Sequence, residues 1–243
     1  LAVQAFDASV AQSPAVADFG FEVARTQQHL VIGPWTHSGD DGDVSFPEVD
    51  ETSPLPTLES AWAEGCLGSQ TQVFDELPSV YLYVMGDTDD AEAPGNGWEA
   101  FTEWPPPSDL VGLYLREADL LDVSPPLSAQ PAATYIHDPT DPVPTLGGNQ
   151  LMLAAGPVDQ TPIEAREDVA VFTTEPLVEP VEIIGRVRAR LWLSSLTEDS
   201  QVVVRLTDVY PDGRSILIAS GIAAYEGTGA FTPVEVDLWS TAM

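Results

Sequence analysis

The stretch EIIGRVRARLWLSS, residues 182–195, decides the fold class of this chain. From residue 186 to residue 193 its side chains alternate between two kinds, which is the period of a β-strand with one buried face. One face carries arginines and the other carries apolar side chains: Arg186, Arg188 and Arg190 against Val187, Ala189, Leu191 and Leu193. We interpret the arginines as half of an ion-pair ladder with carboxylates on a neighbouring strand, and keep an anion-binding site as the alternative.

Similar short segments follow one another from about Val80 to the end of the chain, separated by Pro, Gly, Asp and Asn. They include VYLYVM (80–85), ATYIHD (133–138), VAVFTT (169–174), QVVVRLTDVY (201–210), SILIASGIAAY (215–225) and PVEVDLW (233–239). Pro211, Asp212 and Gly213 indicate a tight turn between two of these runs. The fold class is therefore mainly β, and we predict a jelly-roll-like β-sandwich domain over residues 80–243, truncated at its C-terminus.

The first 38 residues follow a different pattern. LAVQAF (1–6) and HLVI (29–32) are typical of short apolar strands, and SPAVADFGFEVARTQQ (13–28) between them is typical of a helix, with Ser13 as N-cap and Pro14 at its first position. Strand, helix and strand predict a βαβ unit with two parallel strands. Such a unit is too small to be stable alone, so residues 1–38 are expected to be the remnant of a larger domain.

Residues 39–79 connect the two parts. They are rich in Asp, Glu, Pro, Ser and Gly, and we predict a connector with one short helix near Leu58 to Trp62.

Composition limits the possible partners. The 243 residues hold 39 acids against 8 basic residues, all of them Arg, which gives a net charge of −31. A nucleic-acid partner is therefore excluded by repulsion, and the lack of any run of about 18 apolar residues argues against a membrane span. We expect a soluble protein, either extracellular or periplasmic, or from the cytoplasm of a salt-loving organism, in which molar salt would screen the repulsion. The oligomeric state is left open.

Metal and disulfide chemistry have little support. The single Cys66 cannot form an internal disulfide, and three scattered histidines have no zinc-binding spacing. Asp40, Asp41 and Asp43 could bind a hard cation such as calcium, but they do not match an EF-hand loop, and we interpret them as a solvated turn. No metal or cofactor is predicted.

His37 is the candidate catalytic residue. The predicted strand at 29–32 ends sharply at Gly33 and Pro34, which puts His37 in a loop just past the carboxyl end of the strand, where open α/β sheets place catalytic groups. Histidine changes charge near neutral pH and can take a proton from a nucleophile and return it to a leaving group. The alternative is an ordinary exposed loop histidine.

A resemblance adds to this pattern. HLVIGPWTH (29–37) resembles the catalytic-histidine segment of the cocaine esterase and X-Pro dipeptidyl-peptidase family of α/β-hydrolases. Five further segments resemble that family's C-terminal β-rich domain, in the same order: PSVYLYVMGD (78–87), GWEAFTEWPPP (97–107), YIHDPTDPVPTLGG (135–148), EAREDVAVFTTEPL (164–177) and VVVRLTDVYPDGRS (202–215). The resemblance covers most of residues 30–240, and it implies that residues 1–38 are the end of an α/β-hydrolase catalytic domain.

The family resemblance implies a Ser-His-Asp triad, in which His37 is the base. AFDAS (5–9) resembles the family's aspartate segment, which implies Asp7 as the acid in a loop position equivalent to that of His37; Asp18 and Asp40 are the rivals. No G-x-S-x-G elbow occurs, so the nucleophilic serine is expected in a missing N-terminal hydrolase segment, outside this chain.

Two functions follow from these observations. The first is part of a serine hydrolase that cleaves a small ester or peptide substrate, of the esterase or X-Pro dipeptidyl-peptidase type, with this chain alone inactive. The second is a non-catalytic β-sandwich that acts as a binding or interaction module. Trp35, Trp98 and Trp104 could line an acyl pocket, but we interpret them as packing residues, because a tryptophan buries a large area wherever it falls.

Overall fold

The computed structural model describes residues 2–7, 28–37, 42–67 and 76–243. The chain divides into two compact units. The first consists of Leu1–Trp35, Ser45–Pro106 and Ala242–Met243, and the second of Thr36–Val44 and Pro107–Thr241. The predicted helix at 13–28 lies almost entirely outside the described residues, as do Asp18, Asp40 and Asp41. None of the helices in the described ranges is long and apolar enough to cross a membrane.

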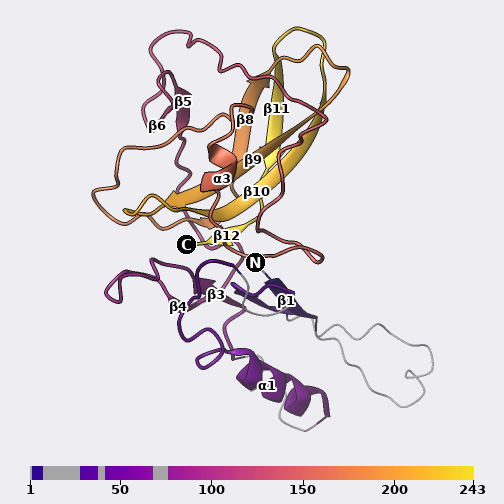
Figure 1. The fold of residues 1–243 in the computed structure, drawn as a ribbon. Coiled ribbons are helices and arrows are strands. Elements are labelled where there is room, and N and C mark those ends of the chain that lie inside the picture. The colour runs from indigo at the N-terminus through magenta and orange to yellow at the C-terminus, as the bar shows by residue number, and fades with distance from the viewer. Residues whose placement is uncertain (1, 8–27, 38–41, 68–75) are drawn as a thin grey trace, which may run out of the picture. The chain divides into compact units, whose positions relative to one another are not determined.

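A four-stranded sheet forms the first unit (Figure 1). Its strands lie in the order β1 (Ala2–Asp7), β2 (Gln28–Gly33), β3 (Val80–Val84) and β4 (Gly97–Phe101). β1 runs antiparallel to β2, β2 runs parallel to β3, and β3 runs antiparallel to β4. Helix α1 (Leu55–Leu67) lies in the connection between β2 and β3. This helix confirms the one expected near Leu58 to Trp62, and it buries Leu58 and Ala61.

The predicted parallel pairing of the first two strands is wrong. β1 and β2 pair antiparallel over six residues, from Ala2 opposite Gly33 to Asp7 opposite Gln28. The parallel neighbour of β2 is β3, so the strand-helix-strand unit lies one strand further along the chain. An apolar run carries no information about strand direction, because both ladders satisfy its backbone groups. A parallel pair needs a long crossover, and the connection between β2 and β3 supplies one.

The four-stranded sheet takes two of its strands from the region predicted to be the β-sandwich domain. β3 and β4 complete the sheet of β1 and β2, and the first compact unit continues to Pro106, while the domain start at residue 80 stays a prediction. β3 belongs there because most of its side chains are buried, which is typical of a strand covered on both faces. Its buried members are Val80, Leu82, Tyr83 and Val84.

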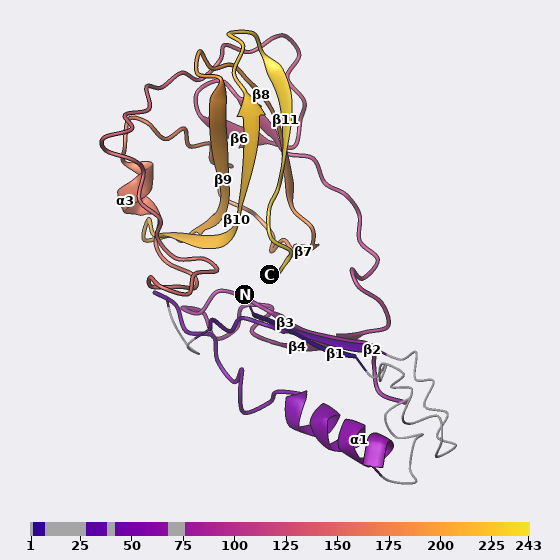
Figure 2. The same cartoon turned by 90° about the vertical axis from the view of Figure 1, so that its right-hand side faces the viewer.

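The second unit is built from strands that pair two by two (Figure 2). The pairs are β5 (Tyr114–Arg116) with β6 (Leu120–Asp122), β8 (Arg188–Leu193) with β11 (Thr232–Asp237), and β9 (Asp199–Val209) with β10 (Ser215–Glu226). β7 (Ile184–Gly185) pairs with β12 (Thr241–Ala242), whose first residue, Thr241, is the last of this unit. The short helix α3 (Thr161–Glu164) precedes β7. The mainly β prediction is confirmed, while the jelly-roll topology stays a prediction.

The turn between β9 and β10 confirms the sequence signal at residues 211–213. Gly213 has a φ of +94°, which only glycine adopts without strain. Its amide donates to the Tyr210 carbonyl at 2.9 Å, and the Tyr210 amide donates to the Arg214 carbonyl at 2.9 Å. The turn is further tied by the Arg214 guanidinium, which lies 2.7 Å from the Asp212 carboxylate.

Two of these two-stranded ribbons, β8–β11 and β9–β10, share one hydrophobic core. Apolar side chains from β8, β9, β10 and β11 meet there around four buried residues: Ala219, Val234, Val236 and Leu238. At Gly221 a side-chain Cβ would collide with the Asp237 carbonyl, so β10 and β11 approach more closely than any other residue would allow. These four strands therefore form the structural centre of the second unit.

Removing core volume at Val236, which is 0 % exposed, should destabilise the chain. Val236→Ala is expected to lower the free energy of unfolding by about 2 kcal/mol, from lost burial and a residual cavity. The matched control is Glu235→Ala on the exposed side of the same strand, with an expected effect within about 0.5 kcal/mol. Urea unfolding of both variants measures the difference, and equal losses would contradict the shared core.

Candidate active site

The candidate site is the loop that follows β2. The side chains of Val31 and Ile32 on β2 are buried. In the parallel ladder with β3, Leu30 is the register partner of Val80 and Ile32 that of Leu82. His37 follows the carboxyl end of this strand by four residues, and its side chain is exposed. A parallel pair aligns its carboxyl ends at one edge, where α/β proteins place their reactive groups. The His37 side chain is open to solvent, and its place at this edge of the sheet stays a prediction.

The first residue of this loop to be anchored is Trp35. A Cβ on Gly33 would lie 2.7 Å from the Trp35 ring, so the indole folds back onto the end of β2. The indole N–H donates to the Asp50 carboxylate at 3.2 Å, and the ring centroid lies 5.3 Å from that of Trp98. These contacts fix the backbone two residues before His37.

Trp35 is part of an aromatic clamp, which we define as Trp35, Tyr83 and Trp98. Each clamp residue donates one hydrogen bond to the segment 47–50: Tyr83 Oη to the Pro47 carbonyl at 2.5 Å, Trp98 Nε1 to the Val49 carbonyl at 3.0 Å, and Trp35 Nε1 to Asp50. Tyr83 and Trp98 meet edge to face at 5.6 Å. Their interpretation as packing residues is confirmed for Trp35 and Trp98.

Burial and the nearby Glu48 carboxylate raise the pKa of Tyr83 to about 12. The phenol therefore stays protonated and keeps donating to Pro47 throughout the physiological range. The hydroxyl acts as a structural donor.

Asp7, the predicted acid of the triad, lies at the end of β1. The β1–β2 register sets Asp7 opposite Gln28, at the start of β2, whereas His37 follows the other end of β2. Five strand steps separate Gln28 from Gly33, which is about 17 Å. The expected loop position equivalent to that of His37 is therefore wrong in this pairing, because antiparallel strands carry their carboxyl ends to opposite edges. Within residues 28–37, 42–67 and 76–243, no carboxylate forms an ion pair with His37.

A second histidine of the same motif has a structural role that sequence reasoning missed. His29 is 1 % exposed, and its Nδ1 lies 2.8 Å from the Pro78 carbonyl, which can only accept, so Nδ1 donates. The neighbouring Leu30 amide donates to the Ser79 carbonyl at 2.8 Å. His29 thus ties the start of β2 to the chain that enters β3. The alternation of the strand was the available signal, since His29 shares its inward parity with Val31.

Asp43, the member of the acidic cluster that the structure describes, is also structural. Its carboxylate accepts from the Asp159 amide at 2.8 Å, and its amide donates to the Pro157 carbonyl at 2.9 Å. Burial alone would raise the pKa of Asp159, but hydrogen bonds from Thr161 and the Ser215 amide outweigh it and lower that pKa. Across the described ranges, no group of three His, Cys, Asp or Glu side chains has a metal-binding arrangement.

The chain is similar to known proteins over most of its length. Residues 71–243 match the family described as the X-Pro dipeptidyl-peptidase C-terminal non-catalytic domain. The chain belongs to this family. A cocaine esterase from Rhodococcus sp. (strain MB1 Bresler) is 37 % identical over 210 residues, which are 79 % of this chain and 35 % of that protein.

More distant relatives agree with this family membership. "Putative serine esterase Mb1866c" of Mycobacterium bovis is 26 % identical over 206 residues, 82 % of this chain and 31 % of that protein, and MT1883 of Mycobacterium tuberculosis gives the same figures. The chain spans about a third of the length of these relatives, and their names place it in a hydrolase family. His37 precedes the part of the chain that matches the non-catalytic domain.

The raised pKa of Tyr83 predicts how the free energy of unfolding changes at alkaline pH. The folded-state pKa of about 12 lies above the ordinary value of 10.0. The stabilisation that the protonated Tyr83 gives to the folded state is therefore fully present below pH 10 and is lost as the pH rises toward 12. Tyr83→Phe should lose about 1 kcal/mol at pH 8, because the hydrogen bond to Pro47 is gone, and should show a shallower decline between pH 10 and 12. Urea unfolding across this pH range measures both; identical slopes for the variant and the parent would refute this assignment.

Proposed function

We propose that this chain is the C-terminal part of a serine hydrolase that cleaves acyl esters or peptide-like amides. The observation that carries the proposal is the place of His37: an exposed imidazole just beyond the carboxyl end of a strand in a parallel pair, in a chain 37 % identical to a cocaine esterase. The substrate class comes from the names of the relatives and of the family, which include both esterase and X-Pro dipeptidyl-peptidase.

In the proposed mechanism His37 is the general base. Its imidazole takes the proton from a serine hydroxyl as the oxygen attacks the substrate carbonyl, and returns that proton to the leaving alcohol or amine. The serine and the donors that stabilise the oxyanion lie outside this chain. What this chain supplies is position, because Gly33 and the clamp residue Trp35 hold the backbone just before His37.

The acid of the proposed triad is Asp7. Asp7 is kept on the resemblance of AFDAS alone, because the described register leaves it at the far end of β2 from His37. Asp18 and Asp40 are the rivals and lie outside the described residues. An orienting carboxylate holds the imidazole in the tautomer that can accept the proton of serine.

Residues 71–243 have a second candidate function as a binding or interaction module. The specific observation in favour is the family description, which names this domain non-catalytic. The two functions are compatible, because His37 and the domain occupy different parts of the chain.

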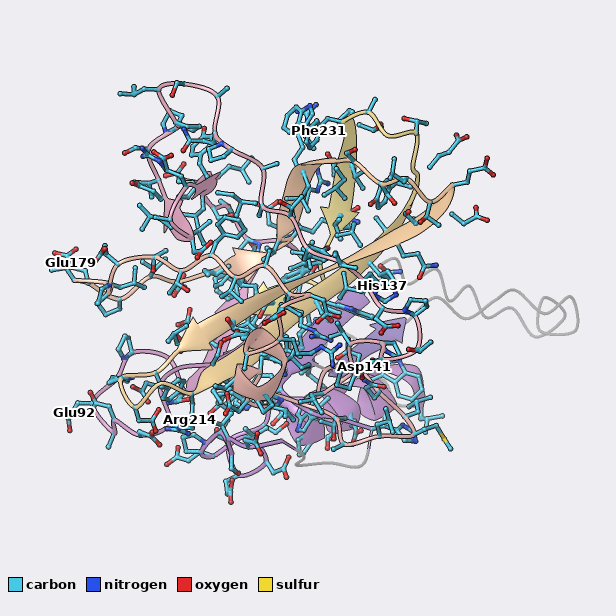
Figure 3. All side chains as sticks on the ribbon, turned by 45° about the horizontal axis from the view of Figure 1, so that its top comes forward. Glu92, His137, Asp141, Glu179, Arg214 and Phe231 are labelled. Atoms are coloured by element: carbon cyan, nitrogen blue, oxygen red, sulfur yellow. The ribbon has the colours of Figure 1, made fainter. Side chains whose placement is uncertain are left out.

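The role of His37 is tested in the complete protein with a chromogenic ester. His37→Ala should lower kcat/KM by at least about 10³-fold, as loss of a triad member does. The matched control is His137→Ala, another exposed histidine, which lies within the matched domain at residues 71–243 (Figure 3) and should keep kcat/KM within about twofold. This 243-residue chain alone should neither turn over the ester nor react with a fluorophosphonate probe. An active His37→Ala enzyme would refute the assignment.

The acid is identified by comparing Asp7→Asn with Asp40→Asn in the complete protein. Asp7→Asn should reduce kcat by about 10⁴-fold with little change in KM, because the wrong tautomer of the imidazole is then favoured. Asp40→Asn should stay near the parent. Thermal unfolding shows whether each variant folds, and the reverse pattern of losses would transfer the role from Asp7 to Asp40.

A further inference from the structure

The β8–β11 ribbon has an outer face that its core does not use. We define the outer face as the side chains that alternate with the core residues on these strands: Arg186, Arg188, Arg190 and Trp192 on one strand, and Pro233, Glu235, Asp237 and Trp239 on the other. All eight are exposed. Arg186 and Trp239 lie just beyond the named strands, where the Leu238 amide still donates to the Val187 carbonyl at 2.9 Å and continues the ladder. Figure 3 labels Phe231, which marks the start of β11.

Two tryptophans stand at opposite ends of this face. Trp192 is 60 % exposed and Trp239 is 55 % exposed, although both are large apolar side chains. The guanidinium carbon of Arg190 lies 5.6 Å from the Trp192 ring centre, and continuing the register sets Arg186 opposite Trp239. Trp192 therefore has a guanidinium group over its ring, Trp239 has an arginine opposite it in the extended register, and more than half of each indole is exposed. Six strand steps between residues 186 and 192 make the outer face about 20 Å long.

The charges between the tryptophans are close to balanced. Arg188 forms an ion pair with Asp237 at 3.0 Å, and Arg190 is the register partner of Glu235. The ladder expected from the sequence is confirmed at Arg188 alone, because Arg190 has a carboxylate only as its register partner and Arg186 is opposite Trp239. With three arginines and two carboxylates, the outer face lacks the acidic excess of a chain whose net charge is −31.

This combination selects the chemistry of a ligand. The net charge of −31 repels anionic polymers, and a protein partner would bury a patch depleted of charges, whereas five of these eight positions are charged. A neutral sugar chain offers hydroxyls that both donate to carboxylates and accept from guanidinium groups. Its C–H faces also suit an exposed indole, which has a large apolar surface.

We propose that the outer face of the β8–β11 ribbon binds a neutral oligosaccharide chain, with Trp192 and Trp239 as stacking platforms and the Arg188–Asp237 and Arg190–Glu235 pairs as the polar contacts. The length of about 20 Å suits several sugar units in a row rather than one. Sugar binding at this face is independent of catalysis by His37.

Affinity electrophoresis of the chain in native gels tests this proposal. Four gels contain a neutral polysaccharide (galactomannan, glucomannan, arabinoxylan or mixed-linkage β-glucan), one contains polygalacturonate and one contains no sugar. We expect retardation in at least one neutral gel and none with polygalacturonate. Trp192→Ala and Trp239→Ala should each weaken the retention by about tenfold. The control Trp62→Ala, on α1 in the first unit, should behave like the parent chain.

Tryptophan fluorescence measures the dissociation constant for the polysaccharide that retards the chain. This constant should change less than about twofold between dilute buffer and 1 M NaCl, because the ligand is uncharged. Three results in the gels would overturn the proposal: no retardation in any neutral gel, equal retention of the parent and both tryptophan variants, or retardation by polygalacturonate alone. Acrylamide quenching of tryptophan fluorescence tests whether the face is accessible. A complete protein or dimer in which acrylamide no longer quenches Trp192 and Trp239 would also overturn the proposal. Near-parental thermal unfolding shows that the variants are folded.

Discussion

The parallel ladder between β2 and β3 is the constraint on which the candidate site depends. Two adjacent strands can run parallel only if the chain crosses back over the sheet, and the connection with α1 makes that crossing. The ladder aligns the carboxyl ends of both strands at one edge, and the loop that leaves β2 there carries His37. The aromatic clamp then holds this loop at Trp35, two residues before the exposed His37.

The sequence predicted those features that short-range patterns encode. Alternation identified β8 and the ion pair of Arg188, and the Pro-Asp-Gly turn identified the β9–β10 hairpin. Strand direction and sheet membership were not predictable, because an apolar run satisfies either ladder and either sheet. The position of Asp7 failed for this reason, since it depended on the direction of β1. His29 was missed because a buried histidine and a catalytic one look alike in sequence.

The chain combines a segment that carries His37, before residue 71, with a domain described as non-catalytic, residues 71–243. The first supplies one exposed imidazole, and the second supplies a ribbon whose inner side is core and whose outer side is charged and aromatic. A hydrolase that held its substrate at both places would gain effective concentration for an acylated polymer, because the second contact becomes intramolecular. The strong acidity of the chain favours an uncharged substrate in that arrangement.

The most direct measurement is a crystal structure of the complete protein after reaction with an organophosphate that phosphorylates the nucleophilic serine. The proposed mechanism predicts that a ring nitrogen of His37 lies within about 3.5 Å of the modified serine oxygen. A different histidine at that oxygen, or His37 on the opposite edge of the sheet, would contradict it.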